Sequence, residues 1–452
     1  MKISRIFHFC LPAVIFLLPF EIDLRRWGID LPWINTTLEI ALAVTMVFWI
    51  LKKAEERKPV RGTSLGMPVL VFLGVHVLSA LFAAGDPYWG IKYTLRLSGG
   101  VLLFFMITDT VRSREYAVKL ITVLLASCAV SCAVALGEKY FLPHMLGFLK
   151  IFSRERSYLH GVQGLLRVSS TFIYTNVYAM YLEMVIPAAG GMFIYSYMKA
   201  GGFRGIPVCL NYFLVLLFSQ VLFFTYTRSS PIVAAAVFCF MFCLLYAAGR
   251  TAGDSARGAN AYRAAGILLV SVIVLYMLTM KLDFTLQRRM GTITDMKYNP
   301  NATRLYIWKC ALEVIRRNPL SGIGPDNFRW LYAARYARES PFFVMNPVTP
   351  VPGVDTNSLY LEVLVNLGMG GFAVFSWIVL KSIISSILYL LKNMLLYVKN
   401  NNILLVYAGV LGSLFAYLLH GMVDSFGSYQ AIVFLFWIIL GLVAVIPEFD
   451  RD

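Results

Sequence analysis

The chain has 452 residues, of which 59% are hydrophobic and only 14% are charged, and its formal net charge is +16. A soluble domain is about 45–50% apolar and about 25% charged, and so large an apolar excess cannot be hidden in a core that water surrounds. The composition excludes soluble, disordered, collagen-like and disulfide-stapled proteins and predicts an all-α polytopic membrane protein.

Stretches of about 20 mainly apolar residues, the length that crosses a bilayer, predict about twelve transmembrane helices. The first follows Lys2 and Arg5 as a signal peptide does, but no small-residue cleavage site comes after it, so we expect an uncleaved span. The twelve spans cover approximately 6–22, 35–51, 66–83, 90–108, 118–137, 174–196, 207–225, 230–248, 264–281, 368–390, 403–420 and 429–446.

Every second connection between these spans is rich in basic residues. Two longer segments, 138–173 and 282–357, are considered separately. The short connections of the opposite set contain only Arg25, Arg26 and Arg228. Cytoplasmic loops are rich in Lys and Arg, so we expect both termini in the cytoplasm and the segments 138–173 and 282–357 outside. This asymmetry explains much of the positive charge without a nucleic-acid partner. We treat 1–452 as a single membrane domain with an extracytoplasmic loop at 282–357.

The predicted outer loop 282–357 has ten Lys or Arg residues against six Asp or Glu residues. Orientation in the membrane does not explain positive charge on the outer side. Guanidinium groups bind phosphate oxygens in a bidentate geometry. A phosphate-bearing ligand is therefore one interpretation of this charge, and a solvated or headgroup-facing surface is the other.

Within this loop the pattern predicts a helix over about 301–317, in which Arg304 and Trp308 share a face. Leu312 and Ile315 continue the apolar side, which favours packing over ligand contact for Trp308. The sequence after Asn318 contains Gly-Ile-Gly-Pro at 322–325, which is typical of a tight turn. Such a turn can also cradle a phosphate, but this motif alone is a weak indication.

Several polar side chains lie at the predicted outer ends of spans, where ionisable groups are costly and often functional. Arg228 stands in a very short outer turn, and Asp424 follows His420 by four residues. His420 and Asp424 would share a helix face if the helix continued past Gly421. The alternative for each polar residue is a contact with lipid headgroups or a neighbouring carbonyl. The weaker candidates are Arg167, His420, Lys92 and Arg96.

The sequence contains no signature of a cofactor. The pairs Cys128/Cys132 and Cys239/Cys243 lack the spacing and the His partners of a metal site. No HExxH, Walker or Rossmann motif is present, so we expect neither a metal nor a nucleotide.

Four patches of the sequence together resemble one family. The patches are Arg167-Val168-Ser169-Ser170-Thr171-Phe172 through Asn176, Thr227-Arg228-Ser229, Arg304–Trp308 with Pro319–Phe328, and Tyr360-Leu361-Glu362 through Gly368. In these patches the sequence is similar to the O-antigen ligase and polymerase superfamily, which transfers glycans from polyprenyl-diphosphate carriers on the outer face of the bacterial inner membrane.

The chain departs from the family pattern at one position. The family usually has a His eleven residues before the Gly that is Gly368 here, and position 357 is Asn. Asn357 forms hydrogen bonds but cannot accept a proton near neutral pH. The chain must then use another base, such as Glu362 or Asp424, or rely on electrostatics, unless it is an acceptor variant or an inactive member.

The resemblance implies a metal-independent glycosyltransferase of cell-envelope polysaccharide or lipopolysaccharide assembly. It implies a lipid-bilayer location, a polyprenyl-diphosphate-linked glycan donor, and an acceptor that is a glycan, lipid A-core or a protein. The implied catalytic residues are Arg228, Arg304, Asn357, Asp424 and Glu362, and the implied substrate-binding residues are Arg167, Trp308 and Tyr360. The alternatives are a lipid-linked glycan transporter and a non-catalytic member of an envelope assembly system.

Overall fold

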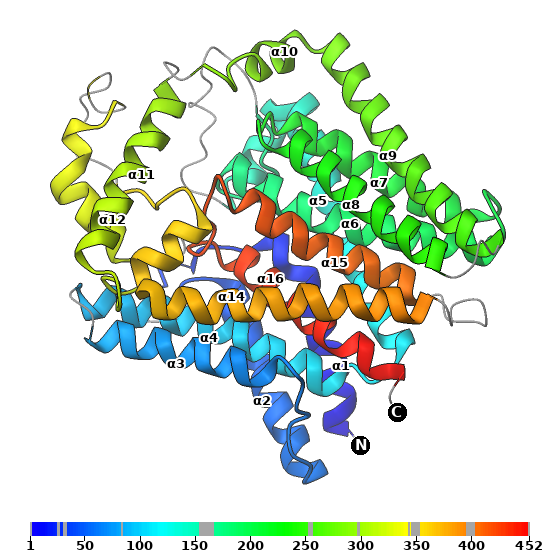
Figure 1. Ribbon diagram of the computed structural model, residues 1–452, viewed down its shortest axis with the longest axis horizontal. Coiled ribbons are helices and arrows are strands. Elements are labelled where there is room, and N and C mark those ends of the chain that lie inside the picture. Colours follow the sequence, from blue (N-terminus) through cyan, green and yellow to red (C-terminus); the bar gives the residue numbers. More distant parts are fainter. Residues whose placement is uncertain are drawn as a thin grey trace.

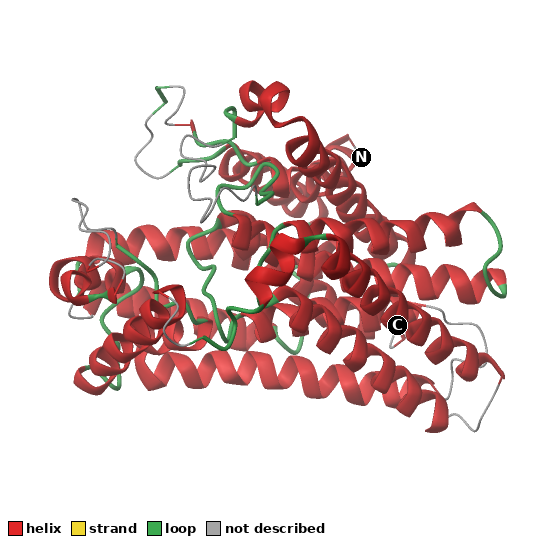
Figure 2. Cartoon of the chain, turned by 90° about the horizontal axis from the view of Figure 1, so that it is seen from above, coloured by secondary structure: helices red, strands yellow, loops and turns green. Residues whose placement is uncertain are grey.

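The computed structural model describes residues 2–24, 28–29, 34–82, 85–152, 167–251, 256–295, 299–341, 344, 353–394 and 403–450. These residues form helices and loops, with one isolated bridge between Asp23 and Thr36 and no strand within the described ranges (Figure 2). The predicted all-α fold class is confirmed.

The helices follow one another along the chain with few long connections (Figure 1). They are α1 (Lys2–Leu17), η1 (Leu18–Phe20), α2 (Thr37–Glu56), α3 (Gly66–Phe82), α4 (Pro87–Thr110), α5 (Arg114–Leu149), α6 (Thr175–Ala200), α7 (Ile206–Phe224), α8 (Ser230–Thr251), α9 (Ala256–Leu282), α10 (Phe284–Met290), α11 (Asn299–Arg317), α12 (Asn327–Leu331), η4 (Tyr332–Tyr336), η5 (Ala337–Glu339), α14 (Leu359–Met394), α15 (Ile403–His420), α16 (Gln430–Val445) and η7 (Ile446–Asp450).

Each predicted span coincides with a helix. Within the described part of the chain, nine helices are long and apolar enough to cross a membrane. The other three positions hold two shorter apolar helices, Ile6–Phe20 and Gly66–Phe82, and α2, which carries Glu39 at its start and Lys52 near its end. Large apolar side chains such as Met277 and Leu278 of α9 are more than half exposed, as expected on a surface that faces lipid.

Two helices extend beyond their predicted boundaries. The expected outer segment 138–173 begins within α5, which continues to Leu149 through a kink at Phe141, and residues 153–166 lie outside the described ranges. The expected span 368–390 begins nine residues too late, because α14 starts at Leu359 and bends at Gly368, whose φ is +65°. A glycine adopts this backbone conformation without a side-chain penalty, so Gly368 allows a bend within α14.

The close crossing of α6 and α15 forms the centre of the bundle. A Cβ atom added to Gly409 would lie 2.8 Å from the Gly191 Cα atom and 2.5 Å from the Pro187 carbonyl oxygen. Small residues at such crossings let two backbones approach and replace the hydrophobic driving force that lipid removes. This contact sets the positions of the N-terminal end of α6 and the C-terminal end of α15, which both reach the site described below.

We predict that Gly409→Ala destabilises the protein by about 1–3 kcal/mol, because the added methyl group overpacks the crossing. The matched control is Gly74→Ala in α3, where an added Cβ meets nothing within 4 Å. Thermal unfolding in detergent measures both variants. Equal stability of the two variants would contradict the proposed role of the crossing.

Candidate active site

The turn between α7 and α8 carries Arg228 and is fastened from several sides. Tyr226 in this turn has a φ of +51°; its hydroxyl donates to Asp283 Oδ2 at 2.5 Å and accepts from Lys139 Nζ at 2.7 Å. Arg289 Nε donates to the Tyr226 carbonyl at 2.7 Å. Burial and the hydrogen bond to Asp283 raise the pKa of Tyr226, so the hydroxyl stays protonated. Positive φ at a bulky residue persists only where the surroundings impose it.

Arg228 connects this turn to the start of α11. Its Nη1 atom donates to the Thr292 carbonyl at 3.2 Å, and Asn301 Nδ2 donates to the same carbonyl at 3.0 Å. Arg304 follows Asn301 by three residues on α11. The Arg304 Nε atom is buried and has no hydrogen-bond partner among the described residues. Arg228 and Asn301, which lies one turn before Arg304 on α11, thus both bind the loop that follows α10.

Arg167 joins the same region from the segment before α6. Its Nε atom donates to the Thr225 carbonyl at 2.9 Å, and its Nη2 atom donates to Asn176 Oδ1 at 2.9 Å. Asn176 lies in the first turn of α6, and its Nδ2 atom donates to Asp424 Oδ2 at 3.2 Å. The amide of Asn176 thus links a guanidinium group to the carboxylate of Asp424.

His420 lies behind these groups at the end of α15 and is 1% exposed. Its Nδ1 atom is 2.6 Å from Glu183 Oε2, and its Nε2 atom is 3.2 Å from Ser229 Oγ. The condition for His420 and Asp424 to share a helix face is not met, because α15 ends at His420 and Asp424 lies in the following loop. His420 instead fastens the turn that carries Arg228 to α6 and α15.

Asn357 lies just before α14 and contacts α11 through its backbone. Its backbone φ is +51°, a conformation that Asn tolerates better than most residues. Trp308 Nε1 donates to the Asn357 carbonyl at 3.2 Å. The Leu359 amide donates to the Asp424 carbonyl at 3.1 Å, which ties the Asn357 segment to the loop that carries Asp424.

Two predicted site residues are engaged in internal hydrogen bonds. The Tyr360 hydroxyl donates to the Leu418 carbonyl at 2.9 Å. The buried carboxylate of Glu362 accepts from Thr356 Oγ1 at 2.9 Å and from Asn366 Nδ2 at 3.1 Å. Glu362 therefore stabilises the segment immediately before Asn357.

The predicted apolar face of the outer helix is only partly correct. Leu312 is 46% exposed, so it does not continue a buried face with Trp308. The buried stripe lies about one residue away on the helix and packs against the segment after Asp326 and against α14. It consists of Ile307, Cys310, Ala311 and Val314. Trp308 thus lies beside this small core, where its indole N–H holds the Asn357 backbone.

The glycine-rich segment forms the predicted turn. Gly322 and Gly324 have φ values of +66° and +92°. The Ile323 amide donates to the Val365 carbonyl at 2.9 Å, and the Gly324 amide donates to the Asn366 carbonyl at 3.1 Å. Because these amides already bind α14, the phosphate-cradle interpretation of this turn finds no support here.

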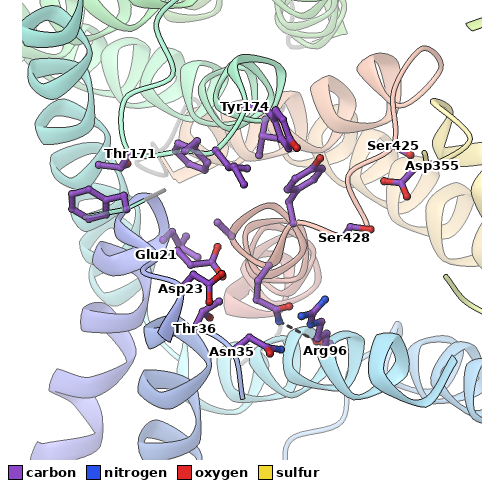
Figure 3. Close-up of a pocket in the computed structure, with 18 of the residues that line it drawn as sticks. Glu21, Asp23, Asn35, Thr36, Arg96, Thr171, Tyr174, Asp355, Ser425 and Ser428 are labelled. Atoms are coloured by element: carbon purple, nitrogen blue, oxygen red, sulfur yellow. Dashed lines mark hydrogen bonds between the residues drawn. The ribbon is translucent and has the colours of Figure 1, made fainter. Parts of the chain in front are cut away.

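A cavity of about 600 Å³ opens beside Asn357 and Asp424, and both residues line it. Figure 3 shows other residues of its lining, among them Arg96 and Asp355. Arg96, a weaker candidate from the sequence, also lines the cavity, as does Arg329, whose Nη2 atom is 2.8 Å from Asp355 Oδ1. Other predicted residues lie outside the lining; these are Arg167, Arg228, Arg304, Trp308, Tyr360, Glu362, Lys92 and His420. The site thus has an arginine-rich part and a cavity that meet at Asn357 and Asp424.

The sequence analysis did not single out the cavity residues Glu21, Asn35 and Arg329. Glu21 and Asn35 lie between α1 and α2, in a segment whose short polar residues give no periodic signal. Arg329 is one of the ten basic residues of the outer loop, and nothing in the sequence pairs it with Asp355. Within the described residues, no group of three or more His, Cys, Asp or Glu side chains could hold a metal ion.

We predict that Glu21→Gln stabilises the protein at pH 8. Burial raises the pKa of Glu21 from 4.5 to about 7, so the folded state holds this proton more tightly than the unfolded chain. The stabilising contribution is present below pH 4.5 and is lost as pH rises through 7. The neutral amide avoids that loss, which is worth roughly 1–3 kcal/mol at pH 8.

Thermal unfolding at pH 5 and pH 8 tests this effect. The difference between Glu21→Gln and the unsubstituted protein should shrink at pH 5. The control, Glu56→Gln, removes an exposed carboxylate at the far end of α2. A pH-independent difference for Glu21→Gln would contradict the prediction.

No curated protein matches the chain. Residues 213–376, about a third of the chain, match the family described as O-antigen ligase. The matched segment runs from α7 to α14 and includes Arg228, Arg304 and Asn357. The resemblance is confirmed for this segment: residues 213–376 of this multi-pass membrane protein are similar to the O-antigen ligase family.

Proposed function

We propose that this protein is a glycosyltransferase that moves a glycan from a polyprenyl-diphosphate carrier to an acceptor hydroxyl. It acts without a metal ion in the bacterial inner membrane, with both termini in the cytoplasm, and serves cell-envelope polysaccharide or lipopolysaccharide assembly. The similarity of residues 213–376 to the O-antigen ligase family supports this class of activity. The observation that carries the proposal is the hydrogen-bonded link from Arg167 through Asn176 to Asp424, beside the turn that carries Arg228, to which Arg167 also donates at the Thr225 carbonyl.

The arginine residues supply charge for the donor. Arg228 and Arg304 stabilise the negative charge that develops on the leaving diphosphate, and Arg167 helps to bind the donor. Fixed guanidinium groups are effective here because they are already oriented when the charge appears. Arg228 is oriented by Thr292 and Arg167 by Asn176.

The acceptor oxygen attacks the anomeric carbon of the donor from the cavity side. A new carbon–oxygen bond forms as the bond between the anomeric carbon and the phosphate oxygen breaks, with inversion, and the electron pair leaves on the diphosphate. Asp424 takes the acceptor proton, and Asn357 holds the hydroxyl through a hydrogen bond. Glu362 contributes by positioning the Asn357 segment, because its carboxylate already binds Thr356 and Asn366.

We predict that Arg228→Ala and Arg304→Ala each reduce glycan transfer by roughly 10²–10³-fold. The assay incubates purified protein with a polyprenyl-diphosphate glycan and candidate acceptors. Arg316→Ala is the matched control, because this exposed residue lies on the same helix as Arg304 and should retain activity. Full activity of both active-site variants would refute the arginine assignment. Carrier transport in liposomes without glycan transfer would instead indicate the transporter alternative.

We predict that Asp424→Asn reduces transfer by about 10²–10⁴-fold, the usual effect of losing a general base. The amide keeps the size of the side chain and can still accept a hydrogen bond from Asn176. The control, Glu313→Gln, changes a partly exposed carboxylate of α11 that pairs with Arg317. An unchanged rate for Asp424→Asn would assign the proton to another group.

A further inference from the structure

The cavity extends far beyond Asn357 and Asp424. It reaches past the N-terminal end of α16 to the segment between η1 and α2, where Glu21, Asp23 and Asn35 line its far wall (Figure 3). Its volume of about 600 Å³ is typical of sites that bind small organic molecules. The proposed mechanism uses one end of this space and leaves the far wall without a role.

The charge of the lining argues against a diphosphate in this space. Described lining residues contribute more carboxylates (Glu21, Asp23, Glu39, Asp355 and Asp424) than guanidinium groups (Arg96 and Arg329). Both guanidinium groups already face carboxylates, since Arg96 Nε is 3.6 Å from Glu39 Oε1 and Arg329 Nη2 is 2.8 Å from Asp355 Oδ1. An anionic ligand would meet a net negative wall.

Buried polar atoms in the lining lack partners. Asn35 and Ser425 are each 3% exposed, and Asn35 Nδ2 and Ser425 Oγ have no hydrogen-bond partner among the described residues. An unsatisfied buried polar atom costs free energy unless a ligand or water binds it. Asn35 and Ser425 lie on different walls of the cavity, so a ligand that fills the cavity contacts both residues (Figure 3).

The wall that holds Asn35 is rigid. Glu39 Oε2 accepts from the backbone N–H of Asn35 at 2.6 Å and from that of Thr36 at 3.2 Å. Thr36 Oγ1 accepts from the backbone N–H of Glu39. This capping box fixes the start of α2. The Asn35 side chain is therefore presented from a preorganised backbone, which lowers the entropic cost of binding.

Aromatic rings complete the lining. Tyr174 and Tyr429 pack edge to face with ring centroids 6.0 Å apart, and Phe152 and Phe172 also line the cavity. Planar amide and carboxylate groups bind sugar hydroxyls, and aromatic faces cover the apolar side of a sugar ring. The lining combines both kinds of group.

We propose that this cavity is the acceptor subsite and that Glu21, Asp23 and Asn35 bind the hydroxyl or amino groups of the acceptor saccharide. The lining selects a neutral or amine-bearing sugar over a uronic or phosphorylated sugar. This inference rests on the proposed function, because an acceptor exists only if the protein transfers a glycan. The donor diphosphate then binds at the arginine residues, and the two substrates meet at Asn357 and Asp424.

Binding of three trisaccharides to the purified full-length protein at pH 8 tests this assignment. The probes are the trimers of N-acetylglucosamine, glucosamine and galacturonic acid, measured by isothermal titration calorimetry. The first two should bind at least tenfold more tightly than the acidic trimer. Glu21→Gln should reduce affinity for the glucosamine trimer at least fivefold, and Asn35→Ala should weaken both favoured trimers. The control, Glu56→Gln, should bind like the unsubstituted protein.

Equal or tighter binding of the galacturonic acid trimer would overturn the proposal, as would absence of binding by all three trimers. Unchanged binding in both Glu21→Gln and Asn35→Ala would also overturn it. Thermal unfolding confirms that each variant is folded, and Glu21→Gln is expected to be the more stable form at this pH. Saccharide binding without any glycan transfer would contradict the proposed function alone, whereas transfer with an unchanged acceptor KM in both variants would contradict this inference alone.

Discussion

The hydrogen bond from Asn176 to Asp424 is the contact on which both parts of the site depend. The Asn176 amide oxygen accepts from Arg167 while its nitrogen donates to Asp424. An amide offers an acceptor and donors in one plane, so this side chain fixes a cation and a carboxylate at the same time without neutralising either directly. This hydrogen-bonded link therefore joins the arginine-rich part of the site to the cavity.

Helix packing determines the positions of Asn176 and Asp424. Asn176 lies at the beginning of α6 and Asp424 just beyond the end of α15, and these helices cross closely through Gly191 and Gly409. A larger residue at the crossing would separate the helices and move the two polar ends apart. The buried contact between Glu183 and His420 joins the same two helices near the site. Apolar packing inside the bundle thus determines polar geometry at its end.

The positions of the helices and the arginine residues could be predicted from the sequence because each has a local signature. Apolar length marks a span, and a charge such as Arg228 in a short outer turn is costly enough to be noticed. The exposed position of Leu312 and the early start of α14 could not be predicted in this way, since they depend on contacts with distant segments. The cavity has no local signature either, because Glu21, Asn35 and Arg329 are far apart in the sequence and line one cavity only in the folded bundle.

The Asn at position 357 is explained by backbone conformation rather than by chemistry. The left-handed region accepts Asn and His more readily than most other residues, so the φ of +51° is compatible with either side chain. The loop can therefore keep its shape when the usual His of the family is replaced, with Trp308 and Glu362 still holding its two ends. What the replacement removes is a proton acceptor. A hydrogen bond from the Leu359 amide joins this loop to the Asp424 carbonyl, and the Asp424 side chain is one of the carboxylates that line the cavity. Under the proposed function, the loop keeps its shape while Asp424 takes the role of base, so the site can differ at position 357 from the family that residues 213–376 resemble.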